Sequence, residues 1–311
     1  MKALVCGSMA YDNIMVFPDK FGNHILPDKV HMLNVSFLVP TLRREFGGCA
    51  GNIAYNMKLL GAPGAAMATV GQDFAPYADW MDSHQLSREY LTEIPGAFTG
   101  QAYITTDMDD NQITAFHPGA MGEAHCNIVP TDAGITLGII SPDGRDGMIQ
   151  HAEQFAAADI PFIFDPGQGL PMFSGDDLRK FIDECSYVTV NDYECELIKE
   201  RTGWDENEIA EQTRALIVTR GAKGSTIYIE GQEPLEIPSA KPAQVVDPTG
   251  CGDAYRAGLI YGLLHELSWP KTGRIASLMG CLKIEQAGTQ NHRFTMAEFG
   301  ERYAQQFGEA L

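Results

Sequence analysis

A glycine loop that runs directly into a helix is the part of this sequence with the clearest chemical meaning. An apolar stretch from Ala254 through Leu264 follows the loop Val246-Asp247-Pro248-Thr249-Gly250-Cys251-Gly252-Asp253. Glycines allow tight turns and a close approach of backbone N–H groups to a ligand, and a helix N-terminus attracts negative charge. The loop therefore predicts a site for a phosphoryl group or a developing anion.

Asp253 lies in the first turn of the predicted helix and points at the same anion site. A carboxylate there can handle a proton, hold a metal ion or simply cap the helix. The helix dipole is expected to lower the pKa of Asp253 and to make it a weak base. A weak base suits phosphoryl transfer, in which an Asp orients the attacking hydroxyl and accepts its proton late.

Two polar features lie near the start of the chain. The stretch Gly47-Gly48-Cys49-Ala50-Gly51-Asn52 opens a predicted helix, where Asn52 can either contact a ligand or cap the helix. Asp12 follows the first apolar strand, and its carboxylate can accept hydrogen bonds from two adjacent hydroxyls or form a local Asx-turn. Both features suit a ligand rich in hydroxyl groups, and both also have a purely structural interpretation.

Two further motifs follow predicted strands in the second half of the sequence. Asn191 and Glu194 have the spacing of a helix cap and its reciprocal carboxylate. Thr219, Gly221 and Gly224 lie between two predicted strands, as a hairpin turn would.

Together these motifs resemble the signatures of the ribokinase-like (phosphofructokinase-B) family of sugar and nucleoside kinases. Residues 247–253 are similar to its C-terminal Asp-x-Thr-Gly-x-Gly-Asp signature, and residues 47–52 to its N-terminal Gly-Gly-x-x-x-Asn signature. Residues 191–194 resemble its Asn-x-x-Glu motif, and residues 219–224 its nucleotide loop, all in the same order along the chain. The sequence has no Walker loop, so it predicts a kinase of another type.

The resemblance implies ATP and Mg²⁺ as cofactors. Asp253 would be the catalytic base that accepts the proton of the substrate hydroxyl. The anion hole for the transferred phosphoryl group would be formed by Gly250, Cys251 and Gly252. Asn191 and Glu194 would hold the magnesium–phosphate region, with Glu194 reaching Mg²⁺ through water. Thr219 and the glycines that follow it, Gly221 and Gly224, would line the phosphates and the ribose of ATP.

The resemblance also extends to a second cation and to the substrate. Asp247 and Thr249 are similar to positions that contribute to a monovalent-cation site, such as a K⁺ site, in many members of the family. Asp12 would bind two adjacent sugar hydroxyls. The residues that would close on the sugar are Gly47, Gly48 and Asn52.

The stretch around Phe116 resembles the lid segment of bacterial adenosine kinases. It makes Phe116 the candidate for stacking on a nucleoside base, although Phe116 can equally be a core residue of a strand. The resulting prediction is an adenosine kinase that phosphorylates the 5′-hydroxyl. The alternatives are a sugar kinase acting on ribose or fructose and a non-catalytic nucleoside-binding protein. A nucleotide-binding oxidoreductase is disfavoured because Gly7-Ser8-Met9 is not Gly-x-Gly-x-x-Gly.

Composition excludes other classes of protein. The 311 residues include 22 Lys and Arg against 41 Asp and Glu, for a net charge of −19, which opposes binding to nucleic acid or to an anionic membrane. The 7 cysteines form no Cys-x-x-Cys pair, and no apolar run reaches the ~18 residues that span a bilayer. We therefore expect a cytoplasmic protein with a small-molecule substrate.

The elements that position these residues alternate between apolar strands and helices. This alternation predicts an α/β fold, and the resemblance narrows it to a ribokinase-like, three-layer α/β/α doubly wound domain that spans residues 1–311. Segments 12–45 and 98–120 do not fit the alternation and are expected to form a small β lid. A strand is predicted over 32–39, with Phe37 facing the base. The resemblance is compatible with a homodimer that pairs through the lid.

Overall fold

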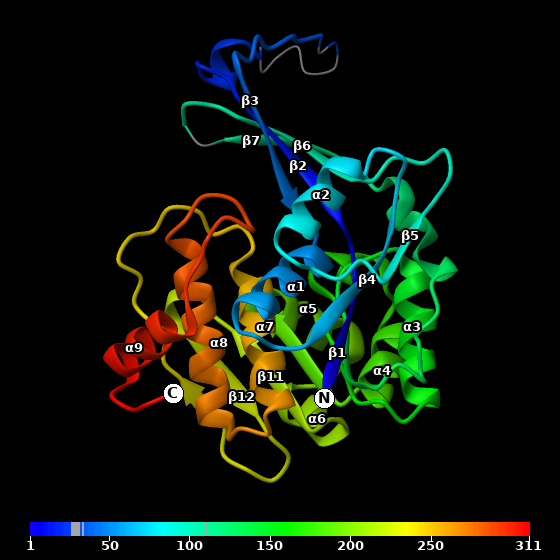
Figure 1. Cartoon of the computed structure of the whole chain (residues 1–311), viewed down its shortest axis with the longest axis vertical. Helices are drawn as coiled ribbons and strands as arrows, with labels where there is room; N and C mark the ends of the chain where they lie inside the picture. The colour runs from blue at the N-terminus through cyan, green and yellow to red at the C-terminus, as the bar shows by residue number, and fades with distance from the viewer. Residues whose placement is uncertain (26–31, 33, 110) are drawn as a thin grey trace.

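Two β-sheets organise the chain, one in the body of the molecule and one in a projecting lid. The computed structural model describes residues 1–25, 32, 34–109 and 111–311. Within these residues, the larger sheet has nine strands in the order β13-β12-β11-β10-β9-β8-β1-β4-β5 (Figure 1). The smaller sheet has four strands in the order β3-β2-β6-β7. The predicted three-layer α/β/α fold with a small β lid is confirmed.

The strands of the larger sheet are mostly short apolar runs, as expected where helices cover both faces. Its parallel strands are β1 (Lys2–Cys6), β4 (Gly64–Val70), β5 (Tyr90–Glu93), β8 (Ile135–Ile140), β9 (Phe162–Phe164), β10 (Tyr187–Asn191) and β11 (Ala215–Thr219). One edge ends in two antiparallel strands, β12 (Ser225–Tyr228) and β13 (Leu235–Ile237). β5 was not predicted, because a short edge strand with half-buried and exposed residues has no clear apolar pattern.

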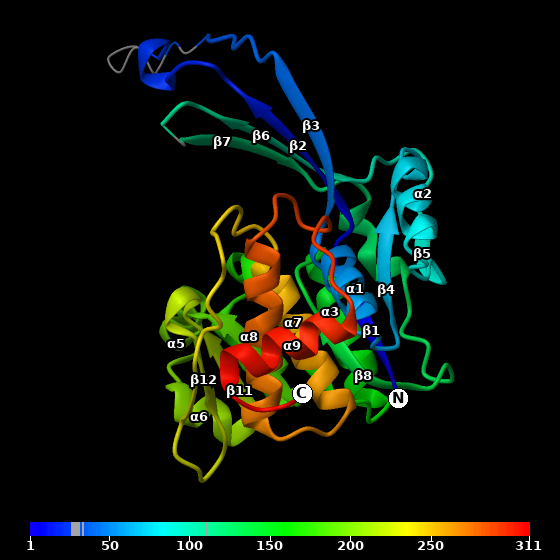
Figure 2. The ribbon, with the colours of Figure 1, turned by 60° about the vertical axis from the view of Figure 1, so that its left-hand side comes forward.

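Helices cover both faces of this sheet (Figure 2). One apolar cluster packs the sheet against α1 (Cys49–Leu59), α2 (Ala75–Ser83), α7 (Cys251–Leu264) and α8 (Trp269–Ile284). A second cluster packs the opposite face against α3 (Arg145–Ala157), α4 (Gly175–Glu184), α5 (Asp192–Thr202) and α6 (Glu206–Gln212). The last helix, α9 (Met296–Phe307), packs against α8.

Short 3₁₀ helices at Phe21–Asn23, Gly119–Cys126, Gly167–Met172 and Gly221–Lys223 connect these elements. Among the helices that the structure describes, none combines the length and the apolar character that a bilayer crossing requires.

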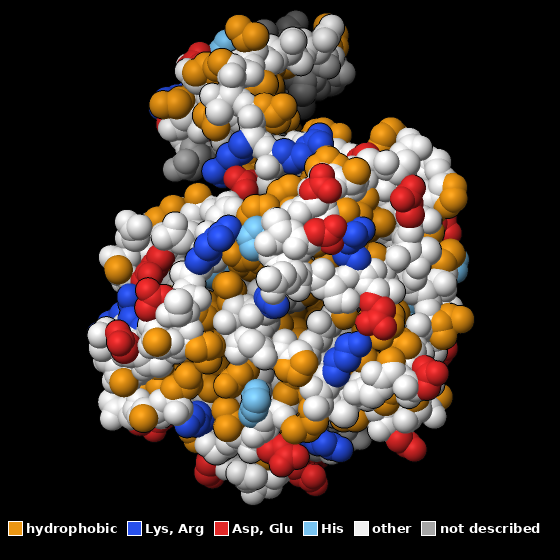
Figure 3. Space-filling view, viewed as in Figure 1, with side chains coloured by type: hydrophobic (Ala, Val, Ile, Leu, Met, Phe, Trp, Pro, Cys, Tyr) orange, Lys and Arg blue, Asp and Glu red, His pale blue; other side chains and the backbone are white. Residues whose placement is uncertain are grey.

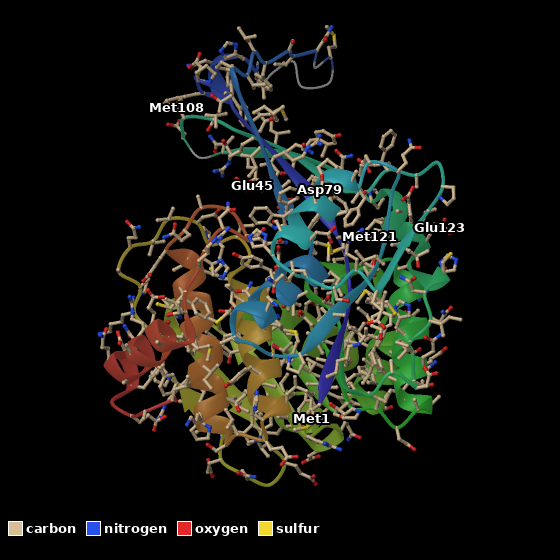
Figure 4. The ribbon with its side chains drawn as sticks, viewed as in Figure 1. Met1, Glu45, Asp79, Met108, Met121 and Glu123 are labelled. Atoms are coloured by element: carbon tan, nitrogen blue, oxygen red, sulfur yellow. The ribbon has the colours of Figure 1, made fainter. Side chains whose placement is uncertain are left out.

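The lid is a four-stranded mixed sheet that projects from the body, as Figure 2 shows. Its strands are β2 (Ala10–Val16), β3 (Thr41–Gly47), β6 (Gly100–Thr106) and β7 (Gln112–His117). β2 follows directly after β1, so the carboxyl ends of the parallel strands point toward the lid. Figure 4 places Met108 far out in the lid and Met1 at the opposite end of the molecule. Residues 26–31, 33 and 110 of the predicted lid segments lie outside the described residues.

Asp12 lies inside strand β2, which rules out the alternative in which it forms a local Asx-turn. The strand predicted over 32–39 is wrong, because the described residues of that stretch, which exclude residue 33, form no strand. The strand begins instead at Thr41, in a charged segment whose pairing with β2 fixes its conformation. Phe37 packs on Phe17 with ring centroids 4.7 Å apart, and it is not among the residues that line the cleft described below.

Candidate active site

A cleft of about 1100 Å³ lies between the lid and the carboxyl ends of the parallel strands. Figure 3 shows the lid overhanging the body. This edge of an open α/β sheet is where such folds bind ligands. The cleft brings together most of the predicted site residues: Asp12, Gly48, Asn52, Phe116, Asn191, Glu194, Thr219, Gly221, Thr249, Gly250, Gly252 and Asp253.

Four predicted site residues lie outside the cleft wall: Gly47, Gly224, Asp247 and Cys251. The N–H of Cys251 donates to the carbonyl of Pro248 at 3.2 Å, so this amide is occupied by the turn of the loop. The anion site therefore depends on the neighbouring glycines more than on Cys251.

Gly250 shapes the candidate anion loop, residues 247–252. It caps helix α7 with φ +78° and ψ +3°, a left-handed conformation that other residues rarely adopt. A Cβ added there would also meet the Thr289 side chain at 3.1 Å. Gly252, exposed in the first turn of α7, lies next to it. The loop thus exposes backbone at the positive end of a helix, as an anion site requires.

Asp253 is held by a side chain from the first glycine loop. Its Oδ2 accepts a hydrogen bond from Nδ2 of Asn52 at 2.8 Å. Asn52 lies within helix α1, which begins at Cys49, so Asn52 does not cap the helix. The two motifs, distant in the sequence, therefore meet in one hydrogen bond at Asp253.

The orientation of Asn52 is fixed by a residue that sequence reasoning missed. Gln290 donates from Nε2 to Oδ1 of Asn52 at 3.0 Å and contacts the Tyr77 hydroxyl at 2.7 Å. Its Oε1 accepts from the indole N–H of Trp80 at 3.0 Å. Because the Asn52 oxygen is occupied by this donor, its amide nitrogen must face Asp253. No local pattern identifies Gln290, since it lies far in the sequence from all three of these partners.

The pKa of Asp253 is raised to about 7, which corrects the predicted decrease. Burial is the largest cause, because the protein around the carboxyl displaces water and disfavours its charged form. The hydrogen bond from Asn52 opposes this effect, and the carboxylate of Asp165 adds to it. The helix dipole does not outweigh the loss of hydration, so Asp253 is a stronger base than the sequence indicated.

A buried ion pair lies one helical turn after Asp253. The Arg256 guanidinium donates to Asp165 in a bidentate pair, with N–O distances of 2.9 and 3.0 Å, and both side chains are buried. Another guanidinium nitrogen donates to the carbonyl of Gly252 at 3.4 Å. The pair fixes the start of α7 beneath the anion loop. Its signal in the sequence was positional, since Asp165 follows strand β9 at the ligand-binding edge.

Asp143 is a second buried carboxylate that the sequence analysis missed. It follows strand β8, and its Oδ2 has no hydrogen-bond partner among the described residues. Burial raises its pKa to about 8, against the effect of the Gly144 N–H. Asp143 lines the cleft as a group that is largely protonated at neutral pH.

Asn191 and Glu194 form a reciprocal helix cap. The Asn191 side chain accepts from the Glu194 N–H at 2.8 Å, and the Glu194 carboxylate accepts from the Asn191 N–H at 2.8 Å. This confirms the structural interpretation and leaves the other Glu194 oxygen without a partner among the described residues. Burial raises the pKa of Glu194. Both residues line the cleft, so the cap and a ligand contact can coexist.

The stretch 219–224 is a tight turn between β11 and β12, since Thr219 pairs with Ser225 in an antiparallel register. The hairpin interpretation is therefore correct. Thr219 and Gly221 also line the cleft, whereas Gly224 does not. A Cβ on Gly224 would collide with the carbonyl of Ile237, which gives that glycine a packing role.

Asp12 and Phe116 form the lid side of the cleft. The Asp12 carboxylate accepts no hydrogen bond from the residues that the structure describes, and burial, with the nearby charges of Glu45 and Asp247, raises its pKa to about 6. A Cβ on Gly47 would lie 2.6 Å from Oδ2 of Asp12, so glycine keeps this carboxylate open. Phe116 is 49% exposed on β7, which shows that it is not a core residue.

Comparisons with known proteins agree with this geometry. The sequence matches the pfkB family of carbohydrate kinases over residues 12–295. It is 31% identical over 271 residues to a nucleoside kinase of Methanocaldococcus jannaschii, covering 86% of this chain and 89% of that protein.

Solved structures extend the comparison. Burkholderia thailandensis nucleoside kinase in complex with inosine has a TM-score of 0.90 and 52% identity, with 99% of each chain covered. The same kinase in complex with ADP-inosine has a TM-score of 0.87 and 53% identity, covering 99% of this chain and 97% of that one. The family match takes in the lid, both glycine loops and Asp253, and this chain therefore belongs to the pfkB family of carbohydrate kinases.

Proposed function

We propose that this protein transfers the γ-phosphoryl group of ATP to the 5′-hydroxyl of a purine ribonucleoside, with adenosine as the substrate that its sequence favours. The observation that carries the proposal is a single cleft that contains Asp12 at the base of the lid, Phe116 within the lid and Asp253 at the anion loop. The nucleoside kinases among its relatives, including one bound to inosine and ADP-inosine, support the class of acceptor.

The nucleoside lies across the lid side of the cleft. The Asp12 carboxylate, which has no hydrogen-bond donor among the described residues, accepts hydrogen bonds from the two ribose hydroxyls. Phe116 and Ile104, on neighbouring lid strands, cover the base with apolar surface. This orientation directs the 5′-hydroxyl toward Asp253, and closure of the lid excludes water that would otherwise hydrolyse ATP.

ATP lies over Asn191, Glu194 and the turn at 219–221. The lining of the cleft is acidic, and Arg256 is the only Lys or Arg among its described residues, so ATP needs positive charge from a cofactor. Glu194 would hold Mg²⁺ through water, because its unpartnered oxygen is the hard ligand that this ion accepts. When bound, Mg²⁺ neutralises charge on the phosphates.

Asp253 orients the attacking hydroxyl and accepts its proton as the new oxygen–phosphorus bond forms, while the bond between the γ-phosphorus and the bridging oxygen breaks and ADP leaves. Asn52 keeps the carboxylate oriented, with its amide fixed by Gln290. The N–H groups near Gly250 and Gly252, at the start of α7, stabilise the charge of the phosphoryl group in transfer.

The test is ADP release from ATP·Mg²⁺ with adenosine, inosine, guanosine, cytidine, ribose and fructose as acceptors. Turnover with adenosine above all supports the finer proposal, and comparable turnover with inosine keeps the nucleoside class with a wider base site. Turnover with a free sugar alone contradicts the roles of Phe116 and the lid. Nucleoside binding without turnover contradicts catalysis.

We predict that kcat/KM for the nucleoside falls with acidity below about pH 7, because Asp253 must be deprotonated to accept a proton. Protonation of Asp12, with a pKa of about 6, steepens the decline at lower pH. The measurement is a pH profile at saturating ATP·Mg²⁺. Asn52→Ala removes the hydrogen bond that lowers the pKa of Asp253, so the midpoint of this variant's pH profile should move to higher pH. A flat profile between pH 6 and pH 8 contradicts the assignment of Asp253 as base.

We also propose that two copies pair through their lids. The lid strands expose large apolar side chains, among them Leu42, Tyr103 and Ile113. An exposed apolar sheet face is a common dimer surface. Sedimentation velocity should then give twice the 34.0 kDa chain mass, and Ile113→Glu should return the monomer. A monomer mass across the micromolar range contradicts this pairing.

A further inference from the structure

A lysine is fully buried behind the anion loop. Lys283, in the last turn of α8, has 0% relative exposure, which is exceptional for this residue type. Its ammonium donates to the carbonyl oxygens of Asp247 at 2.8 Å and Gln286 at 3.1 Å. Burial lowers the pKa of Lys283, and the charge of Asp247 opposes this effect. The ammonium is thus surrounded by main-chain carbonyl oxygens next to the Asp247 carboxylate. Such oxygen ligands would equally suit a bound monovalent cation.

The segments before and after Lys283 are joined to the anion loop. The N–H groups of Val246 and Asp247 donate to the carbonyl of Ile284 at 2.9 and 3.1 Å. The Asp247 carboxylate accepts from the N–H groups of Thr249 and Gly288, both at 2.9 Å. Burial alone would raise the pKa of Asp247. The two N–H donors stabilise its charged form and hold the pKa below its usual value.

The residues at this point do not fit an additional K⁺ ion. Both Asp247 carboxylate oxygens accept backbone N–H groups, and the Asp247 carbonyl already binds an ammonium. A second cation at the same carbonyl would be repelled by Lys283 with little water to screen the repulsion. The sequence predicted a cation site at Asp247 and Thr249. In the structure, the ammonium of Lys283 already provides the positive charge there.

We propose that Lys283 takes the place of a bound monovalent cation, holding the 247–252 loop in its anion-binding conformation, so that the protein works without K⁺. Lys283 does not line the cleft and acts through Asp247, so it is a positioning residue. The loop that it holds contributes Thr249, Gly250 and Gly252 to the cleft wall. Its role in the rate rests on the proposed function, whereas its role as a replacement for a cation does not.

The experiment compares Lys283→Ala with Lys283→Met. The Ala variant leaves a space with unpaired carbonyl oxygens that K⁺ or NH₄⁺ can enter, whereas the Met side chain fills that space with apolar atoms. In choline chloride we expect kcat of both variants to fall by about 10²-fold, as misplaced catalytic groups do, with KM for the nucleoside little changed. Added KCl or NH₄Cl at constant ionic strength should restore part of the rate of Lys283→Ala only.

Thermal melting gives a readout that needs no substrate. KCl, compared with choline chloride, should raise the melting temperature of Lys283→Ala and leave that of the wild type and of Lys283→Met unchanged. This arm still tests the proposal if the wild type phosphorylates no nucleoside. Activation or stabilisation of the wild type by K⁺ overturns the proposal. This measurement on the wild type tests the proposal even if neither variant folds. A folded Lys283→Ala with the wild-type rate in choline chloride, or without a response to any cation, also overturns it.

Discussion

Asp253→Asn should lower kcat for nucleoside phosphorylation by ~10²–10⁴, the loss expected when a general base is removed. The substitution is nearly isosteric, and an oxygen remains to accept the hydrogen bond from Asn52. It also removes a half-buried ionisable group whose pKa is raised to about 7, so the loss of hydration of its charged form no longer opposes folding at neutral pH. We therefore expect a large loss of rate without a loss of stability.

The measurement combines steady-state kinetics with thermal melting of the same samples. Asp146→Asn is a matched control, because Asp146 lies exposed in the first turn of α3 and outside the cleft wall. It changes the net charge equally and should leave kcat unaltered. A folded Asp253→Asn that turns over at the rate of this control contradicts the assignment of the base.

The parts of the site that the sequence predicted well depend on local chemistry. A glycine at φ +78° followed by a helix is encoded within a few residues, and so is the reciprocal cap between Asn191 and Glu194. The rule that ligands bind beyond the carboxyl ends of parallel strands then places these local features in one cleft. The fold class followed from the same alternation of strands and helices.

The parts that the sequence did not predict depend on contacts between distant segments. The hydrogen bond between Asn52 and Asp253 joins residues 201 positions apart, and Gln290 reaches Asn52 from 238 positions away. The pKa of Asp253 moved in the opposite direction from the prediction for the same reason. The helix dipole can be read from local sequence, whereas burial requires the packed structure.

The lid shows a related limit. Its strand β3 carries Arg43, Arg44 and Glu45 in succession, without the alternation that identifies a strand. Pairing with β2 gives it an extended conformation, and through Gly47 it approaches Asp12. The apolar stretch that resembled a strand instead contributes Phe37 to packing within the lid. A single sequence contains little information on which of two neighbouring segments will pair.

Asp12→Ala should lower kcat/KM for adenosine by roughly 10²–10⁴, because it removes two hydrogen bonds to a charged group and each contributes about 1.5–3 kcal/mol. Removal of the 2′-hydroxyl from the substrate deletes one of the same bonds. The wild type should therefore prefer adenosine over 2′-deoxyadenosine, and Asp12→Ala should lose most of that preference. The ratio of the two kcat/KM values, measured for both proteins, gives the coupling between Asp12 and the hydroxyl.

The stability of an Asp12 variant should change in the opposite direction from its activity. Burial and the charges of Glu45 and Asp247 raise the pKa of Asp12 to about 6, so its ionised form destabilises the folded protein above that pH. Asp12→Asn removes this penalty and should raise the melting temperature at pH 8, with a smaller gain at pH 5, where the wild-type carboxyl is protonated.

Equal losses of kcat/KM for adenosine and 2′-deoxyadenosine, or a lower melting temperature at pH 8, would show that Asp12 supports the fold rather than the ribose. A gain in stability together with a loss of ribose recognition is the behaviour of a carboxylate kept unpaired for its ligand.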